Sequence, residues 1–136
     1  MMTDRIIALD VGTRRVGVAT ASLDTKIPSQ HSTLEMGENI YDEIEILMNE
    51  NNASTIVIGL PRNLSGDDTA QTEYVRHFAT RLNKYKIVFQ GEALTSVKAK
   101  DELTAMGKPY TKGDIDSLAA VYILEDYFSE PGIDHV

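Results

Sequence analysis

Near its start the chain reads Arg5-Ile6-Ile7-Ala8-Leu9-Asp10-Val11-Gly12-Thr13-Arg14-Arg15-Val16-Gly17-Val18-Ala19. Two apolar runs of strand length, residues 6–9 and 16–19, flank a short connection in which Gly12 can adopt a positive φ, so the stretch predicts a β-hairpin. Asp10 lies among apolar neighbours, where a carboxylate is costly unless it is paired, hydrogen-bonded or bound to a metal. The alternative interpretation is that Asp10 caps the turn by accepting from nearby backbone amides.

The 136-residue length and ordinary composition, 42% hydrophobic and 25% charged, predict one globular domain over residues 1–130 with a short C-terminal tail, residues 131–136. The chain has no cysteine, which excludes disulfides and thiolate zinc sites. Its three histidines, His31, His77 and His135, have no metal-binding spacing. We therefore expect oxygen atoms to hold any metal.

The sequence gives no sign of a membrane segment. Acidic and mixed sequence follows the N-terminus too closely for a signal peptide, and no apolar run approaches the ~18 residues of a membrane span. We expect a cytoplasmic protein without a membrane partner.

The net charge of −8 argues at first against nucleic acid as a partner, because Lys and Arg drive phosphate binding. The charge is unevenly distributed, however. Residues 62–112 carry a net charge of +3 and the remainder carries −11, much of it in residues 35–50 and 114–134. Those acidic clusters are typical of solvated helix faces, which leaves the basic segment free to face phosphates.

Hydrophobic periodicity predicts the remaining elements. Alternation indicates a third strand over residues 29–36, and short apolar runs indicate buried parallel strands over residues 55–60 and 86–90. Helical spacing predicts helices over residues 40–48, from Asp67 or Asp68 to about Lys84, from Thr95 or Ser96 to about Met106, and from Asp114 to about Phe128. The order predicts an α/β fold with a five-stranded mixed sheet covered by helices on both faces.

The final helix carries an acid on the side that should pack against the sheet. At about 100° per residue, Asp116 lies on the stripe formed by Ala119, Ala120 and Ile123, whereas Asp114 lies on another face. Asp114 is then a first-turn acid favoured by the helix dipole. The alternative for Asp116 is an N-terminal cap of a helix that starts later.

Glu92 directly follows the strand at residues 86–90, at the carboxyl end, where sites of open α/β sheets usually lie. Alone it is equally typical of an exposed loop residue. Together, Asp10, Glu92 and Asp116 form a candidate all-oxygen site suited to Mg²⁺ or Mn²⁺. Two such ions can activate a water and stabilise the leaving oxygen of a phosphodiester.

Three blocks of this sequence together resemble the YqgF-like (RuvX) family, and the resemblance spans nearly the whole chain. The family's Asp, Gly and Arg followed by Gly-Val-Ala are met by residues 10–19, and its Gly-Leu-Pro loop by Gly59-Leu60-Pro61 with Gly66 after it. Its last helix is met by residues 116–124.

The resemblance implies a three-layer ribonuclease H-like fold and a nuclease that matures pre-16S ribosomal RNA or resolves Holliday junctions. It places the family's acidic, metal-binding triad on Asp10, Glu92 and Asp116. The partner would be pre-rRNA or branched DNA, bound by a monomer or a homodimer. Candidate phosphate-binding residues are Arg14, Arg15, Arg62, Lys108 and Lys112.

One block departs from the family pattern, in which Asp-Glu-Arg precedes Leu-Thr. Here Gly91 and Ala93 flank Glu92, so the metal-type acid remains while its Asp and Arg neighbours are gone. Losing an electrostatic partner can cost several kcal/mol in a transition state. A catalytically weakened nucleic-acid-binding or ribosome-binding module is therefore one alternative.

A second alternative arises because residues 9–13 also resemble the first phosphate motif of the actin and sugar-kinase ATPases. Those proteins close two such lobes around ATP, and the length of this chain supplies one.

Overall fold

A computed structural model describes residues 4–63, 65–92, 95–107, 109–129 and 133–134 of the chain, apart from the side chains of residues 92, 95–98, 100 and 133–134. The predictions that concern Lys108 and the side chain of Glu92 lie outside these described residues.

The centre of the molecule is a mixed β-sheet with strand order β3-β2-β1-β4-β5-β6. The hairpin is confirmed, since β1 and β2 pair antiparallel, whereas β1, β4 and β5 run parallel to one another. The five predicted strands are present, and a two-residue strand in the expected tail pairs antiparallel with β5. The strands are β1 (Arg5–Val11), β2 (Arg15–Ser22), β3 (Ser29–Glu35), β4 (Ala53–Pro61), β5 (Lys86–Glu92) and β6 (Ile133–Asp134).

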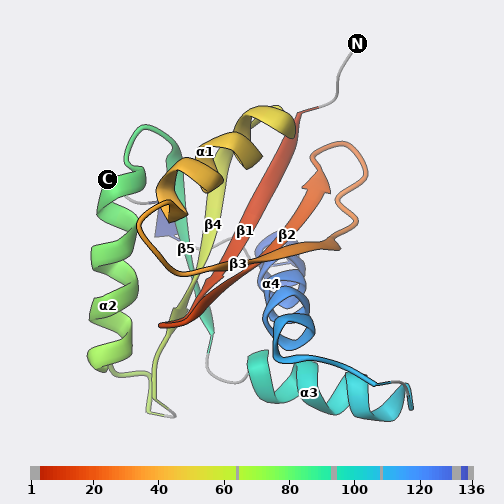
Figure 1. Ribbon diagram of the computed structural model, residues 1–136. Helices are drawn as coiled ribbons and strands as arrows, with labels where there is room; N and C mark the ends of the chain where they lie inside the picture. Colours follow the sequence, from red (N-terminus) through yellow and green to blue (C-terminus); the bar gives the residue numbers. More distant parts are fainter. Residues whose placement is uncertain (1–3, 64, 93–94, 108, 130–132, 135–136) are drawn as a thin grey trace.

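Helices cover both faces of this sheet, as predicted (Figure 1). They are α1 (Ile40–Glu50), α2 (Ala70–Ala79), α3 (Thr95–Ala105) and α4 (Lys112–Ser129), with a short 3₁₀ turn, η1 (Thr80–Leu82), after α2. One buried cluster joins α1 and α2 to one face of the sheet, and a second joins α3 and α4 to the other. None of the described helices is both long and apolar enough to cross a bilayer.

The alternation of side chains along each strand decides which residues meet which helix. In β1, Ile7 and Leu9 belong to the cluster under α1 and α2, whereas Ile6 and Ala8 belong to the cluster under α4. Asp10 continues the second series and therefore lies on the α4 face.

Two predicted helix starts were wrong. Helix α2 is capped by Thr69 and not by Asp67 or Asp68, because Thr69 and Thr72 cap one another reciprocally. Helix α4 begins at Lys112, two residues before the predicted start, so Asp116 is not its N-cap. Thr111 instead accepts from the backbone amide of Asp114 at 3.1 Å.

Candidate active site

The site is organised by a glycine in the first hairpin. Gly17 is the cross-strand partner of Asp10 in the β1–β2 pair. A Cβ placed on Gly17 would lie only 2.0 Å from the backbone oxygen of Asp116, so α4 rests directly on the backbone of β2. This close approach brings the first turns of α4 against the strand that carries Asp10.

Asp116 lies close enough to Asp10 to influence the charge of that buried carboxyl group. Burial raises the pKa of Asp10 to about 7, and repulsion from the Asp116 carboxylate contributes to the increase. A bound cation would stabilise this pair of carboxylates, because Asp10 is buried and its negative charge is costly there. Their oxygen donors fit Mg²⁺ or Mn²⁺, which prefer carboxylate ligands.

Arg15 neutralises one member of this pair. Its Nε donates to Oδ2 of Asp116 at 2.7 Å, and the two side chains are 29% and 19% exposed. The residues are 101 positions apart in the chain and meet because α4 packs across β2. Sequence reasoning assigned Arg15 to nucleic acid and did not anticipate this ion pair.

The backbone of Glu92 ends β5 and lies opposite Pro61, the last residue of β4. Because β1, β4 and β5 are parallel, Asp10 and the backbone of Glu92 lie toward the same, carboxyl edge of the sheet. Among the side chains that the structure describes, no group of three His, Cys, Asp or Glu residues could hold a metal ion. The structure thus brings two of the three predicted acids together, and the role of Glu92 stays a prediction.

The predicted basic residues differ in their surroundings. Arg14 and Lys112 are exposed, at the hairpin turn and at the start of α4. Arg62 lies in the loop after β4, where its Nε donates to Oδ1 of Asp68 at 3.0 Å. The role of all three as phosphate contacts stays a prediction.

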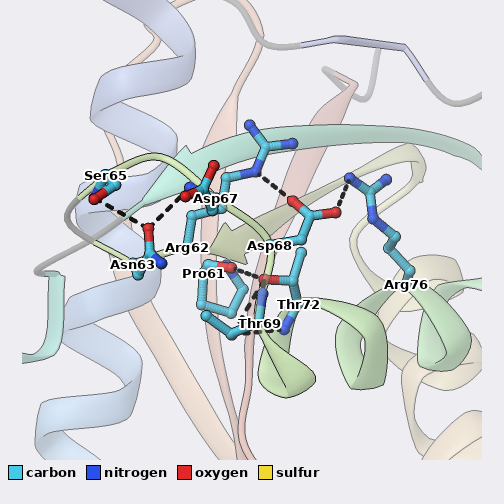
Figure 2. Close-up of polar contacts among 9 residues, drawn as sticks. All are labelled: Pro61, Arg62, Asn63, Ser65, Asp67, Asp68, Thr69, Thr72 and Arg76. Carbon is cyan, nitrogen blue, oxygen red and sulfur yellow. Dashed lines mark hydrogen bonds and ion pairs between the residues drawn. The ribbon is translucent and has the colours of Figure 1, made fainter.

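The loop after β4 is shaped by its own polar side chains (Figure 2). Asn63 Oδ1 accepts from the backbone amides of Ser65 and Asp67 at 3.0 and 2.9 Å. Asp68 lies between two guanidinium groups, since Arg76 on α2 donates to its Oδ2 at 3.4 Å. Arg76 was missed by sequence reasoning, because nothing in the spacing shows that one acid joins it to Arg62.

A second unforeseen feature is an open polar cavity of about 440 Å³ between β3 and the start of α4. Gln30 Nε2 donates to Ser117 Oγ at 2.8 Å, and Thr33 Oγ1 donates to the carbonyl of Gly113 at 2.7 Å. These contacts fix the edge strand β3 to the helix that carries Asp116. The alternation of residues 29–36 predicted a strand and gave no signal of this cavity.

The family model for RuvX, described as Holliday junction resolvase, matches residues 4–130.

The chain belongs to the RuvX family.

Curated relatives support the assignment, each with the name "Putative pre-16S rRNA nuclease". The relative from Shewanella denitrificans is 35% identical, with 93% of this chain and 95% of that protein covered. The relative from Lactococcus lactis subsp. cremoris is 36% identical, with 93% and 94% covered. The relative from Chloroflexus aurantiacus is 39% identical, with 93% and 88% covered. The predicted resemblance is confirmed, and this RuvX chain is a nuclease that hydrolyses phosphodiester bonds.

Solved structures confirm the fold. Thermus thermophilus RuvC in complex with a Holliday junction substrate superposes with a TM-score of 0.59 at 10% identity, covering 96% of this chain and 99% of that one. A second T. thermophilus RuvC structure gives a TM-score of 0.58 at 11% identity, with the same coverage. The RuvX chain therefore has the ribonuclease H-like architecture that the resemblance implied.

Proposed function

We propose that this RuvX protein is a divalent-metal-dependent nuclease that processes the 5′ end of pre-16S ribosomal RNA in the cytoplasm. The observation that carries the proposal is the pair formed by Asp10 and Asp116, two carboxylates on separate elements that are pressed together by the contact of α4 with Gly17. Glu92 is proposed as the third acid, from the same edge of the sheet.

In this proposal Asp10, Asp116 and Glu92 hold Mg²⁺ or Mn²⁺. When bound, such ions would activate a water and stabilise the leaving oxygen of the phosphodiester. Asp10 binds a proton below pH 7 in the metal-free protein, because its pKa is raised to about 7. Proton and metal therefore compete for Asp10, and metal affinity should decline as the pH falls below that value.

Basic residues around the carboxylates would position the nucleic acid. Arg14 lies in the turn of the hairpin that carries Asp10, Arg15 begins β2, and Lys112 begins the helix that carries Asp116. Lys108 is proposed for the same role on sequence grounds. Arg62 extends the set along the carboxyl edge of the sheet, after β4. Such contacts fix the register of a phosphate backbone and do not read its sequence.

The ranking of substrates rests on the relatives. Pre-16S rRNA comes first because the curated relatives carry that name, and a four-way DNA junction comes second because of the family description and the RuvC complex. Symmetric cutting of a junction needs two active sites and hence a homodimer, whereas trimming one RNA end needs a single copy.

Gly91 and Ala93 favour a second candidate, a nucleic-acid-binding or ribosome-binding module with weakened catalysis. They replace the Asp and Arg that usually flank the family's glutamate, and the backbone of Gly91 lies in β5 directly before Glu92. This alternative predicts salt-sensitive binding with no metal requirement.

The test is cleavage of a 5′-extended 16S precursor RNA and of a four-way DNA junction, each with Mg²⁺ or Mn²⁺. We expect wild-type protein to cut the RNA and Asp10→Asn to be slower by about two orders of magnitude or more, since it removes a metal-holding charge. Asp24→Asn is the matched control, because Asp24 is exposed on the β2–β3 connection.

Each outcome separates the candidates. Preferential cutting of the junction would reverse the ranking of substrates. Binding without cleavage at any metal would favour the weakened module, and equal rates for wild type and Asp10→Asn would exclude the proposed site.

A further inference from the structure

The guanidinium of Arg15 binds the carboxylate of Asp116, one of the two acids proposed to hold a metal ion. Its Nε lies 2.7 Å from Oδ2 of Asp116, the distance of a charge-assisted hydrogen bond. The Asp116 carboxylate, which repels the carboxylate form of Asp10, is thus already neutralised in part by the guanidinium of Arg15.

A divalent ion and this guanidinium compete for one carboxylate. An ion such as Mg²⁺ binds carboxylate oxygens at about 2.0–2.1 Å. It withdraws electron density from the oxygen that it binds, which makes that oxygen a weaker acceptor for an N–H donor. The two positive groups also repel each other at such short range. Binding of a metal at Oδ2 of Asp116 therefore weakens its bond to Arg15 and favours a guanidinium that turns away.

Only the side chain of Arg15 has to move. Its carbonyl accepts from the amide of Gly12 at 2.9 Å, and its backbone pairs with Glu35 of β3, so the main chain is fixed on both sides. The side chain is 29% exposed and can rotate toward solvent. A phosphate there offers the guanidinium a replacement partner, for which its planar fork is well suited.

We propose that Arg15 is a resident counter-ion that couples the two ligands of this nuclease, an inference that rests on the proposed metal-dependent function. Arg15 holds Asp116 while the site lacks metal, and a nucleic-acid phosphate draws it away. Release of Asp116 then raises the affinity for the divalent ion. Because coupling between two ligands is reciprocal, the metal raises the affinity for nucleic acid by the same factor.

Calorimetric titration with Mg²⁺ alone tests the first half of this coupling in three proteins: wild type, Arg15→Gln and Arg14→Gln. Arg14→Gln is the matched control. It removes the same charge from the neighbouring residue, whose side chain is exposed. We expect Arg15→Gln to bind Mg²⁺ about tenfold more tightly than Arg14→Gln does, within the usual range of coupling between sites. Equal affinities would show a long-range charge effect only and would overturn the proposal.

The second half is tested by repeating the titration with a short RNA hairpin, whose integrity is checked on a gel afterwards. We expect the hairpin to tighten Mg²⁺ binding to wild type by about fivefold or more and to leave Arg15→Gln nearly unchanged. The same tightening in both proteins would contradict the coupling.

A spectroscopic readout follows the side chain itself. The Nε–H resonance of Arg15 should move when diamagnetic Mg²⁺ saturates the wild-type protein, and Arg15→Lys, with its charge but without this N–H, identifies the signal. If Mg²⁺ saturates the protein and the Arg15 resonance does not shift, the coupling proposal is overturned, whereas the proposed metal site is still supported. If none of the proteins binds Mg²⁺, the metal-dependent function itself fails and the coupling fails with it.

Discussion

At the scale of single residues, Asp10 carries a free-energy cost in the metal-free protein. Its pKa is about 7 in the folded chain against an ordinary value of 3.8. Between these values the folded state binds more protons than the unfolded state, so stability falls as the pH rises through this window. Above pH 7 the whole cost is present, and a bound cation would offset it.

Asp10→Asn should therefore stabilise the protein in EDTA at pH 8. The expected gain is about 1–4 kcal/mol, since one pKa unit corresponds to about 1.4 kcal/mol and the side chain keeps some contact with solvent. The gain should shrink toward pH 5 and vanish below about pH 4. Urea denaturation at these pH values, with Asp24→Asn as the control, measures it, and an Asp10→Asn variant no more stable than wild type at pH 8 would refute the assignment.

Gly17 is the residue on which the approach of α4 depends. Gly17→Ala would place a methyl group 2.0 Å from a backbone oxygen of α4, which the helix can relieve only by moving. We expect a loss of about 3 kcal/mol or more, at the upper end for overpacking, together with a weaker affinity for Mg²⁺. Gly37→Ala is the matched control, because nothing lies within 4 Å of a Cβ there. Equal unfolding midpoints for the two variants would contradict this role of Gly17.

The chemistry of these residues was predictable from sequence, but their contacts were not. Asp10 and Asp116 stand out because an acid on an apolar face needs a partner. The Arg15–Asp116 ion pair depends on where α4 lands on β2, and no local pattern encodes a contact across 101 positions. The close packing on Gly17 is hidden for the same reason, since a strand glycine also marks bulges and bends.

At the scale of elements, α2 is held to the sheet by its first turn. Thr69 accepts from the amide of Thr72, and the Thr72 hydroxyl accepts from the amide of Thr69 at 2.9 Å. The same hydroxyl donates to the carbonyl of Pro61, the last residue of β4 (Figure 2). This turn thereby fixes the loop that carries Arg62 and Asp68.

Thr72→Val should destabilise the protein by about 1–3 kcal/mol, because it keeps the shape of a fully buried side chain but removes the hydroxyl that bonds the Thr69 amide and the Pro61 carbonyl. Thr72→Ser, which keeps the hydroxyl, should lose less. Thermal unfolding of both variants measures the difference, and a Val variant as stable as the Ser variant would contradict the importance of these hydrogen bonds.

Hydrophobic periodicity predicted the helices α1 to α4 and the strands β1 to β5, because burial on one face of an element repeats at a fixed spacing. The helix starts were less predictable. Asp67, Asp68 and Thr69 are all residue types that cap helices well. Thr69 is the cap because it bonds reciprocally with Thr72, while Asp68 pairs with Arg62 and Arg76. Strand β6, which pairs with β5, was also not predicted, because two residues are too few to show a periodic pattern.

At the scale of the whole molecule, a chain of net charge −8 must concentrate its basic residues to bind nucleic acid. We expect the logarithm of affinity for an RNA hairpin to fall linearly with the logarithm of salt concentration. Arg62→Gln should reduce the magnitude of that slope by about 1. Arg81→Gln is the control, because Arg81 lies over the ring of Tyr41, 4.4 Å from its centroid, beside α1. An unchanged slope for Arg62→Gln would remove Arg62 from the interface.

We propose that Asp10 and Asp116, which the packing of α4 on β2 brings together, form the metal-binding core of this nuclease. Anomalous X-ray scattering from crystals soaked in Mn²⁺ tests it most directly. We expect Mn²⁺ in contact with carboxylate oxygens of both Asp10 and Asp116, with Glu92 as a further ligand and Arg15 turned away from Asp116. Mn²⁺ bound elsewhere, or no Mn²⁺ at these two residues in a protein that still cleaves RNA, would contradict it.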